Sequence, residues 1–283
     1  MRASIIAARR TAVVPRGGAF ARLSIEALAA PVIAALLVDA GMDAAEVDEV
    51  IVSNALGAGG NPARRVALAA GLPERVAGLS VDRQCAGGLD AILLARAMVE
   101  SGAARVVIAG GVESYSRRPL RLRTDPDGGA AVPYDQPPFT PWPDRDPQMA
   151  QAADALAQRL GISRAMQDAW AVASHTKAQT MPLAEIVPLA GQGHDAFTRD
   201  LTPALAARAK PLSGTITAAN SAVAADAAAL ASAIRALGTT GSPLSADVQQ
   251  WGSDQFKQIY AKAGVQRPDI WWCNISGGTD AGA

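Results

Sequence analysis

Residues 81–100, VDRQCAGGLDAILLARAMVE, mark the point where a predicted strand becomes a predicted helix. The short apolar run from Val76 to Val81 precedes Cys85, and a long run with few charges follows Gly88. Because this second run is apolar nearly all the way round, it predicts a helix that is buried rather than amphipathic. Cys85 is therefore expected at the N-terminus of a core helix.

The expected position of Cys85 suits a nucleophile. The unpaired N–H groups and the positive dipole end of a helix favour a thiolate. Gly87 and Gly88 would let backbone or substrate approach closely. A single cysteine among apolar residues is, however, more often a small buried hydrophobe than a catalyst. Position alone leaves both interpretations open.

The residues around Cys85 resemble those of the thiolases, the family of acetyl-CoA acetyltransferases and 3-ketoacyl-CoA thiolases. The family's nucleophile lies in Asn-Arg-Gln-Cys-(Gly/Ser)-Ser-Gly-Leu, and residues 82–89 here are DRQCAGGL. The family then has Gly-Gly-Val-Glu-Ser-Met-Ser, and residues 110–116 here are GGVESYS. The resemblance implies a thiolase-like layered α-β-α domain, a coenzyme A thioester as substrate with no further cofactor, and Cys85 as the acylated residue.

Other segments strengthen the resemblance, which runs from residue 1 to about 232. Residues 61–64, NPAR, and 70–73, AGLP, match a thiolase run. Met149 stands where the family has a Met-Gly pair that lines the acyl-CoA tunnel. Residues 217–221, TAANS, resemble a segment whose alanine and serine contact the pantetheine of coenzyme A. The resemblance therefore implies that Met149, Ala218 and Ser221 bind the substrate.

The sequence predicts two parts. Residues 1–235 are expected to form the thiolase-like N-terminal domain, with a long loop insertion at about 117–215. Residues 236–283 form a short segment that resembles a fragment of an AMP-forming acyl-CoA synthetase, most like acetoacetyl-CoA synthetase, at 238–245, GTTGSPLS, and 273–280, CNISGGTD.

A thiolase continues into a second domain with Gly-His-Pro and Cys-x-Gly-Gly-Gly segments. We expect this domain to be missing, because neither histidine here precedes a proline and too few residues separate Cys85 from Cys273 to hold it. The expected activity is a thiolase-type acyltransferase, an acetyl-CoA C-acyltransferase of fatty acid metabolism, that forms a cysteine acyl-enzyme but is impaired in turnover. Two alternatives stay open: a non-catalytic module for CoA binding or dimerisation, and a non-functional fusion product.

Composition excludes several other classes of protein. Lys+Arg and Asp+Glu both number 26, so no net charge favours a nucleic-acid partner. A chain with 49% hydrophobic and 18% charged residues is globular rather than disordered. No apolar run is long enough for a bilayer, no spacing suggests a metal site, and the N-terminus does not suggest a signal peptide. A cytoplasmic protein without membrane contact is expected, and apolar surface left uncovered predicts a homo-oligomer.

Strand and helix signals alternate along the first part of the chain. Strands are expected at 4–8, 49–53, 76–81 and 105–109, and helices at 24–40, 61–71 and 86–100. This alternation is typical of a layered α/β domain with crossover connections. Pro31 predicts a kink in the first helix or a later start.

The texture changes after Ser116. Residues 119–147 are rich in proline without periodicity, which predicts a structureless loop or lid. Further helices are expected at 146–160 and 163–180, before a turn-rich segment at 215–226. Four arginines at the start of the loop are more often a solvated face than a site for the phosphates of coenzyme A; they are Arg117, Arg118, Arg121 and Arg123. His175, alone on its helix, is expected to be structural.

Overall fold

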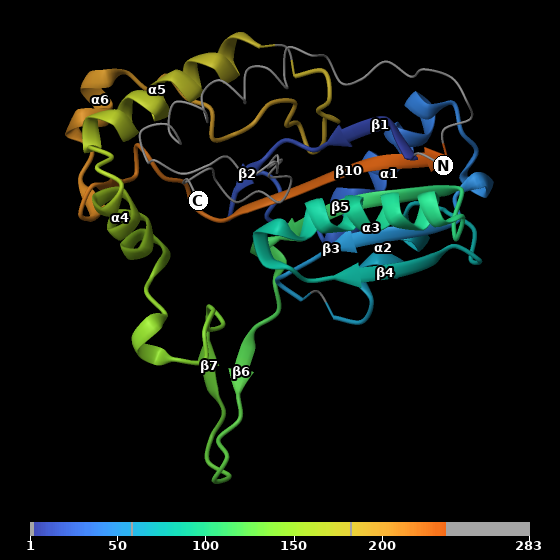
Figure 1. Cartoon of the computed structure of the whole chain (residues 1–283), viewed down its shortest axis with the longest axis horizontal. Helices are drawn as coiled ribbons and strands as arrows, with labels where there is room; N and C mark the ends of the chain where they lie inside the picture. Colours follow the sequence, from blue (N-terminus) through green and yellow to red (C-terminus); the bar gives the residue numbers. More distant parts are fainter. Residues whose placement is uncertain (1–2, 58, 182, 236–283) are drawn as a thin grey trace.

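The computed structural model describes residues 3–57, 59–181 and 183–235. The segment 236–283, which includes Cys273, therefore lies outside the described residues. A mixed sheet with the strand order β1-β10-β5-β3-β4 forms the centre of the molecule, and β2 pairs with β10 (Figure 1). The strands of this sheet are β1 (Ala3–Arg10), β2 (Val14–Pro15), β3 (Glu49–Ser53), β4 (Ala77–Val81), β5 (Val106–Ser114) and β10 (Ala225–Arg235).

Three helices cover the two faces of the sheet. Helices α1 (Ile25–Ala40) and α2 (Pro62–Ala69) lie on one face, and α3 (Gly87–Ser101) lies on the other (Figure 1). Alternate residues of β5 supply both cores: Ile108 packs on the α1 side and Val107 on the α3 side. The parallel neighbours β4, β3 and β5 and the layered α/β architecture confirm the predicted fold class.

The helix ends follow from local chemistry. The Ser24 side chain accepts the N–H of Ala27 at the start of α1, and Gly41 ends the helix with a φ of 60°. The helix begins at Ile25, with Pro31 inside it, so the alternative of a later start was wrong. The cap and the buried apolar face outweigh the cost of about 3 kcal/mol for an interior proline.

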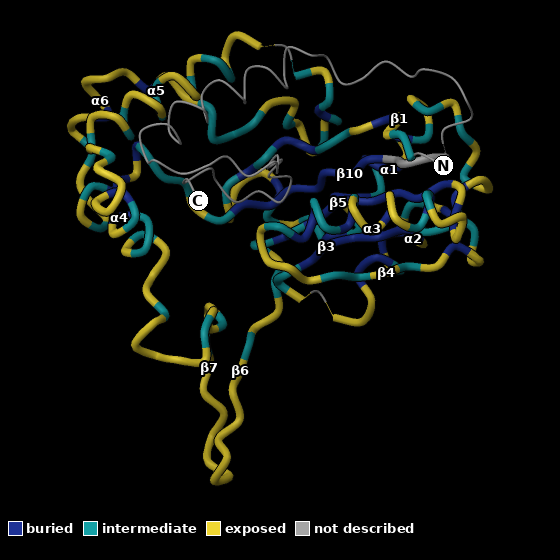
Figure 2. Tube along the Cα trace, viewed as in Figure 1, coloured by how far each residue is buried: buried dark blue, intermediate teal, exposed yellow. Residues whose placement is uncertain are grey.

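Helix α3 is buried along one face only. Ala91, Ala95 and Val99 pack against the sheet, whereas Leu93 and Leu94 are 48% and 40% exposed. Figure 2 shows exposed segments along α3. The prediction of a helix buried on all sides was therefore wrong. Its outer face is not covered by any element in the part of the chain that the structure describes.

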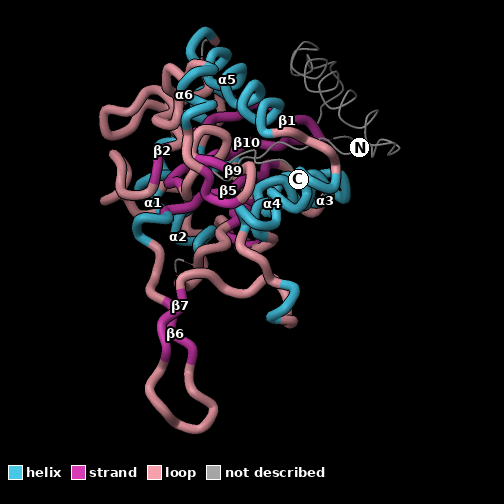
Figure 3. The backbone as a smooth tube through the Cα atoms, turned by 90° about the vertical axis from the view of Figure 1, so that its left-hand side faces the viewer, coloured by secondary structure: helices cyan, strands magenta, loops and turns pink. Residues whose placement is uncertain are grey.

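The insertion at 117–215 begins beyond the carboxyl end of β5. Strands β6 (Arg121–Arg123) and β7 (Val132–Tyr134) form an antiparallel ribbon that projects from the body (Figure 3). The prediction of a structureless stretch was wrong here, because these residues pair across a turn. The rest of the insertion and the turn after it contain α4 (Met149–Arg159), α5 (Arg164–Thr180), α6 (Pro203–Arg208), β8 (Pro211–Ser213) and β9 (Ile216–Thr217).

The described residues also contain single turns of 3-10 helix, which are η1 (Ala44–Glu46), η2 (Gln84–Ala86), η3 (Tyr115–Arg117) and η4 (Pro143–Arg145). The helix predicted from residue 146 begins at Met149 instead, where Gln148 caps it, and the helix predicted after Ser163 is confirmed as α5. Within the described ranges, none of the helices combines the length and the apolar character needed to span a membrane.

Candidate functional site

The carboxyl ends of three parallel strands lie side by side at one end of the sheet. β3 ends at Ser53, β4 at Val81 and β5 at Ser114. In open α/β sheets ligands bind outside the carboxyl ends of the strands. Figure 1 shows helices α4 to α6 on the same side of the sheet.

Cys85 lies at the same end of the sheet, in the turn η2 (Gln84–Ala86) between β4 and α3. Its side chain is exposed. Ala86 is the N-cap of α3 and provides no side-chain hydrogen bond. The N–H of Gly87 donates to the Gln84 carbonyl, but no side chain caps the helix, so its positive dipole end lies beside Cys85. The position predicted for Cys85 is confirmed, whereas its role as a nucleophile stays a prediction.

The turn before Cys85 has a constrained backbone. Gln84 has a φ of 50°, in the left-handed region, which costs about 1 kcal/mol or more for a residue with a side chain. The carboxylate of Asp82 accepts the Gln84 N–H at 2.9 Å and so holds this conformation. Arg83 pairs with Asp90 of α3 at 2.9 Å and ties the turn to the helix.

Glycine allows α3 to begin directly against β3. A Cβ added at Gly87 would overlap the Oγ of Ser53 and lie 2.9 Å from its Cβ. Ser53 is buried, and its side chain occupies the space that a side chain at residue 87 would need. The first residue of α3, and with it the Cys85 turn, is thus positioned by the last residue of β3.

We expect Gly87→Ala to destabilise the fold by about 1 to 3 kcal/mol, the usual cost of overpacking. Gly193→Ala is the matched control, because a Cβ there would meet nothing within 4 Å. The double variant Gly87→Ala with Ser53→Ala, which lacks the overlapping hydroxyl, should recover part of the lost stability. Thermal unfolding of the three variants measures this, and a Gly87→Ala melt equal to wild type would show that the contact is not tight.

Exposure and the open helix end predict that Cys85 reacts with iodoacetamide faster than Cys273. Peptide mapping after partial alkylation measures both sites in one sample. Faster modification of Cys273, with Cys85 inert, would contradict the prediction.

Glu113 is a functional candidate to which the sequence analysis gave no role. Its carboxylate accepts hydrogen bonds from the Nδ2 of Asn54 at 2.9 Å, the N–H of Leu56 at 3.4 Å and the N–H of Ala55. Burial raises the pKa of Glu113 to about 7, and the charge of Asp82 acts in the same direction. The two backbone donors and Arg121 lower the pKa but do not offset burial. A carboxyl group near the carboxyl end of a buried apolar strand was the signal in the sequence.

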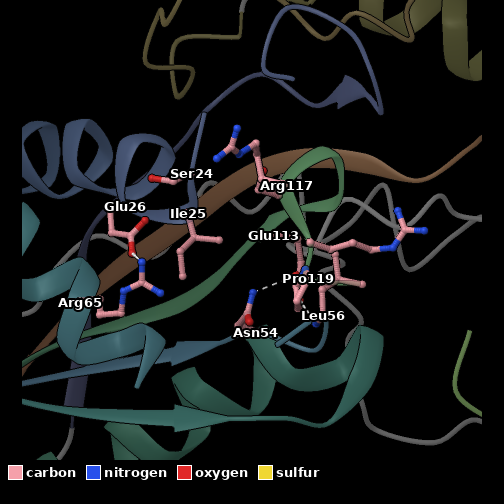
Figure 4. Close-up of a pocket in the computed structure, with 11 residues that line it drawn as sticks. Ser24, Ile25, Glu26, Asn54, Leu56, Arg65, Glu113, Arg117 and Pro119 are labelled. Carbon is pink, nitrogen blue, oxygen red and sulfur yellow. Dashed lines mark hydrogen bonds and ion pairs between the residues drawn. The ribbon is translucent and has the colours of Figure 1, made fainter. Parts of the chain in front are cut away.

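A polar cavity of about 150 Å³ opens beside Glu113 (Figure 4). Asn54 and Glu113 lie on one side of it, and the start of α1 lies on the other. Its volume suits a few water molecules or a small ligand. The lining residues are Ser24, Ile25, Glu26, Asn54, Leu56, Arg65, Glu113, Ser114, Arg117, Arg118 and Pro119.

The predicted substrate-binding residues lie in and after the insertion. Met149 begins α4 and is 61% exposed. Ala218 is exposed, and its carbonyl accepts a hydrogen bond from Arg199 at 2.7 Å. Ser221 lies in the same turn and donates its hydroxyl to the Thr217 carbonyl at 2.6 Å. The structure thus groups Ala218 with Ser221 and places Met149 on a helix that packs against β8 and β9.

Three of the four loop arginines are engaged within the protein. Arg118 pairs with Asp135 and lies over the Tyr115 ring. Arg121 donates to the Leu56 carbonyl at 2.8 Å. Arg123 lies over a tyrosine ring, and Arg117 is exposed beside the cavity. These contacts favour the interpretation of this segment as a protein surface over a phosphate site.

Neither histidine belongs to a candidate metal site. The Nδ1 of His175, on α5, accepts the Arg199 N–H at 3.4 Å. Burial, and then the charge of Arg199, lower the pKa of His175. Among the described residues no group of three or more His, Cys, Asp or Glu side chains is placed to hold a metal ion.

Three comparisons report similar proteins. The family model "Thiolase, N-terminal domain" matches residues 3–234. "Putative acetyl-CoA C-acetyltransferase YhfS" of Bacillus subtilis (strain 168) is 40% identical over 244 residues, which cover 81% of this chain and 62% of the relative. "Putative acetyl-CoA C-acetyltransferase VraB" of Staphylococcus haemolyticus (strain JCSC1435) is 38% identical over 245 residues, which cover 81% and 64%.

The crystal structure of the Bacillus anthracis acetyl-CoA acetyltransferase superposes with a TM-score of 0.73 at 30% identity. The match covers 83% of this chain and 65% of that one. The chain thus spans less than two thirds of the length of each of these proteins.

Proposed function

The chain belongs to the thiolase family, and on this premise we propose that it accepts acyl groups from coenzyme A thioesters through an acyl-enzyme at Cys85. The observation that carries this proposal is the exposed thiol of Cys85 at the uncapped N-terminus of α3. A nucleophile at a helix N-terminus is favoured as a thiolate.

The proposed step is an acyl transfer between two thiols. The Cys85 thiolate attacks the thioester carbonyl carbon, and the carbonyl oxygen takes up negative charge. The positive dipole end of α3 would stabilise that charge. When the tetrahedral intermediate collapses, the bond from the carbonyl carbon to the sulfur of coenzyme A breaks, and the leaving thiolate takes a proton from water. An S-acyl cysteine and free coenzyme A result.

We assign substrate binding to Met149, Ala218 and Ser221 by resemblance to the family. Exposure of Met149 and Ala218 supports this, because both side chains can be reached by a ligand. Ser221 gives its hydroxyl hydrogen to the turn, so it would meet a ligand as an acceptor.

Isotope exchange between labelled coenzyme A and acetyl-CoA tests the proposed step, because exchange needs only acylation and its reversal. We expect exchange that depends on Cys85 and is lost in Cys85→Ala. Absence of exchange at high protein concentration would contradict the proposal. Coenzyme A binding without exchange, measured by titration calorimetry, would support the alternative of a non-catalytic binding module.

We also propose that the chain self-associates through the edge strand β4. β4 ends the sheet order, so one side of its backbone is left without a strand partner in the described part of the chain. Leu79 of this strand is 42% exposed. An exposed edge with an apolar side chain is a template for pairing with a second copy.

Light scattering is expected to give the mass of a dimer or larger oligomer, and Leu79→Lys is expected to lower it toward the monomer, because charge on an edge strand opposes pairing. Val38→Lys is the matched control, since Val38 is 80% exposed on α1. A clean monomer at high concentration would contradict the prediction.

The finer expectations stay predictions. They are the cytoplasmic location, the part in fatty acid metabolism, the division at residue 235 and the resemblance of 236–283 to an acyl-CoA synthetase.

A further inference from the structure

Glu113 is a half-buried carboxyl group that the proposed acyl transfer does not use. Residues 107 and 109 of β5 pack in the core beneath α3, so alternation sends the side chains of 111 and 113 to the same face. Gly111 confirms this direction, because a Cβ there would lie 3.7 Å from the Cα of Gly88. The Glu113 side chain therefore leaves the sheet on the face where α3 and the Cys85 turn begin.

The carboxylate of Glu113 fixes the segment that follows β3. Its donors among the described residues belong to 54–56: the Asn54 Nδ2, the Ala55 N–H and the Leu56 N–H. The carbonyl of Leu56 is held from the other side by Arg121 at 2.8 Å. Asn54 further donates to the Val112 carbonyl of β5 at 3.0 Å. Ala55 and Leu56 are thus bound through both their N–H and their C=O groups.

Asn54 and its neighbour Ser53 contact the two ends of the Cys85 turn. The N–H of Asn54 donates to the carbonyl of Val81 at 3.1 Å, at the end of β4. Ser53, the residue before Asn54, is in contact with Gly87, the first residue of α3. Cys85 lies between Val81 and Gly87, so residues 53 and 54 support the turn at its entry and at its exit.

We propose that Glu113 is a positioning residue for Cys85: its carboxylate holds residues 54–56, which directly follow Ser53, and through this segment it positions the turn that presents the Cys85 thiol at the start of α3. This inference rests on the proposed function, because it assigns Glu113 to the acyl-transfer site. It does not require contact between Glu113 and the substrate. The positioning can also be measured without any thioester, through the reactivity of Cys85 toward a small alkylating reagent.

The test is the rate constant for alkylation of Cys85 by iodoacetamide, read by peptide mapping at about pH 7.5, below the range where an ordinary cysteine ionises. We expect Glu113→Gln to lower this rate by up to about 10-fold, because a thiol displaced from the end of α3 loses the stabilisation of its thiolate by the helix dipole. The control Glu100→Gln removes a carboxylate at the far end of α3, paired with Arg96 at 3.1 Å, and should stay within about twofold of wild type. In the double variant Asn54→Ala with Glu113→Gln, Cys85 should be alkylated no more slowly than in the slower of the two single variants. The two substitutions act through the same segment, so their effects should not add.

A purely structural role for Glu113 gives a different result. The melting temperature would then fall while the alkylation rate of the folded protein stayed at the wild-type value, which would overturn the proposal. Additive effects of the two substitutions would also overturn it. If Glu113→Gln fails to fold, Arg121→Gln loosens the same segment from the carbonyl side, and the same slower alkylation is expected.

Failure of the proposed function is distinguishable from failure of this inference. Wild-type protein without isotope exchange would remove acyl transfer, whereas the alkylation ratio would still decide whether Glu113 positions Cys85.

Discussion

Alanine in place of Gly110 is expected to cost the chain a large part of its folding stability. Gly110 lies in β5 opposite Leu230 of β10 and has a φ of 156°. An added Cβ would overlap the carbonyl oxygen of Ala229 and lie 2.9 Å from the Cα of Leu230. Both obstacles are backbone atoms of a central strand, so no side chain can rotate away. We expect the free energy of unfolding to fall by about 4 kcal/mol or more. A typical domain has a free energy of unfolding of roughly 10 kcal/mol.

Gly111→Ala is the matched control for this substitution. The neighbouring residue lies in the same strand, and a Cβ there would have only ordinary contacts at 3.6 to 3.7 Å. Denaturant unfolding followed by circular dichroism measures both variants. Equal midpoints for the two would show that β5 and β10 are not packed as closely as described.

The second large effect is the dependence of stability on pH that Glu113 causes. Its pKa is about 7 in the folded protein and is expected near 4.5 when unfolded. The folded state therefore binds more protons between these values, and stability falls as the pH rises through this window. The stability that the protonated Glu113 carboxyl group contributes is complete below about pH 4.5 and is lost above about pH 7. The change amounts to about 3 kcal/mol, at 1.36 kcal/mol per pKa unit.

Glu113→Gln should lack this dependence. The free energy of unfolding of the variant, relative to wild type, is expected to increase by about 2.5 kcal/mol between pH 5 and pH 8. Taking the difference between the two proteins removes the contributions of Glu49, whose pKa is raised by burial, and of His175, whose pKa is lowered. A difference that is flat across this range would show that the carboxyl group is ionised throughout.

The sequence was sufficient to place Cys85 but not to place its supports. The order of strand, turn, two glycines and helix depends on neighbouring residues, so local pattern and family resemblance located the turn. The partners of Glu113 lie 57 to 59 residues away at Asn54 to Leu56, and only the pairing of β3 with β5 brings them together. No local pattern reports such a contact.

Strand β10 shows the opposite limit. Its residues 225–235, ADAAALASAIR, favour a helix by intrinsic propensity, and the sequence analysis predicted no strand there. The structure places them as a central strand, antiparallel to both β1 and β5. Backbone pairing on two sides and small side chains between two helical layers outweigh local preference. The exposed face of α3 was also not predicted, because the burial of a helix face depends on which other elements pack against it.

The intact mass of the protein after incubation with acetyl-CoA tests acyl transfer to Cys85 most directly. The expected result is a gain of one acetyl group, mapped to the peptide that contains Cys85, released by free coenzyme A and absent from Cys85→Ala. An unchanged mass, or acetylation that persists in Cys85→Ala, would contradict the assignment of Cys85 as the acylated nucleophile.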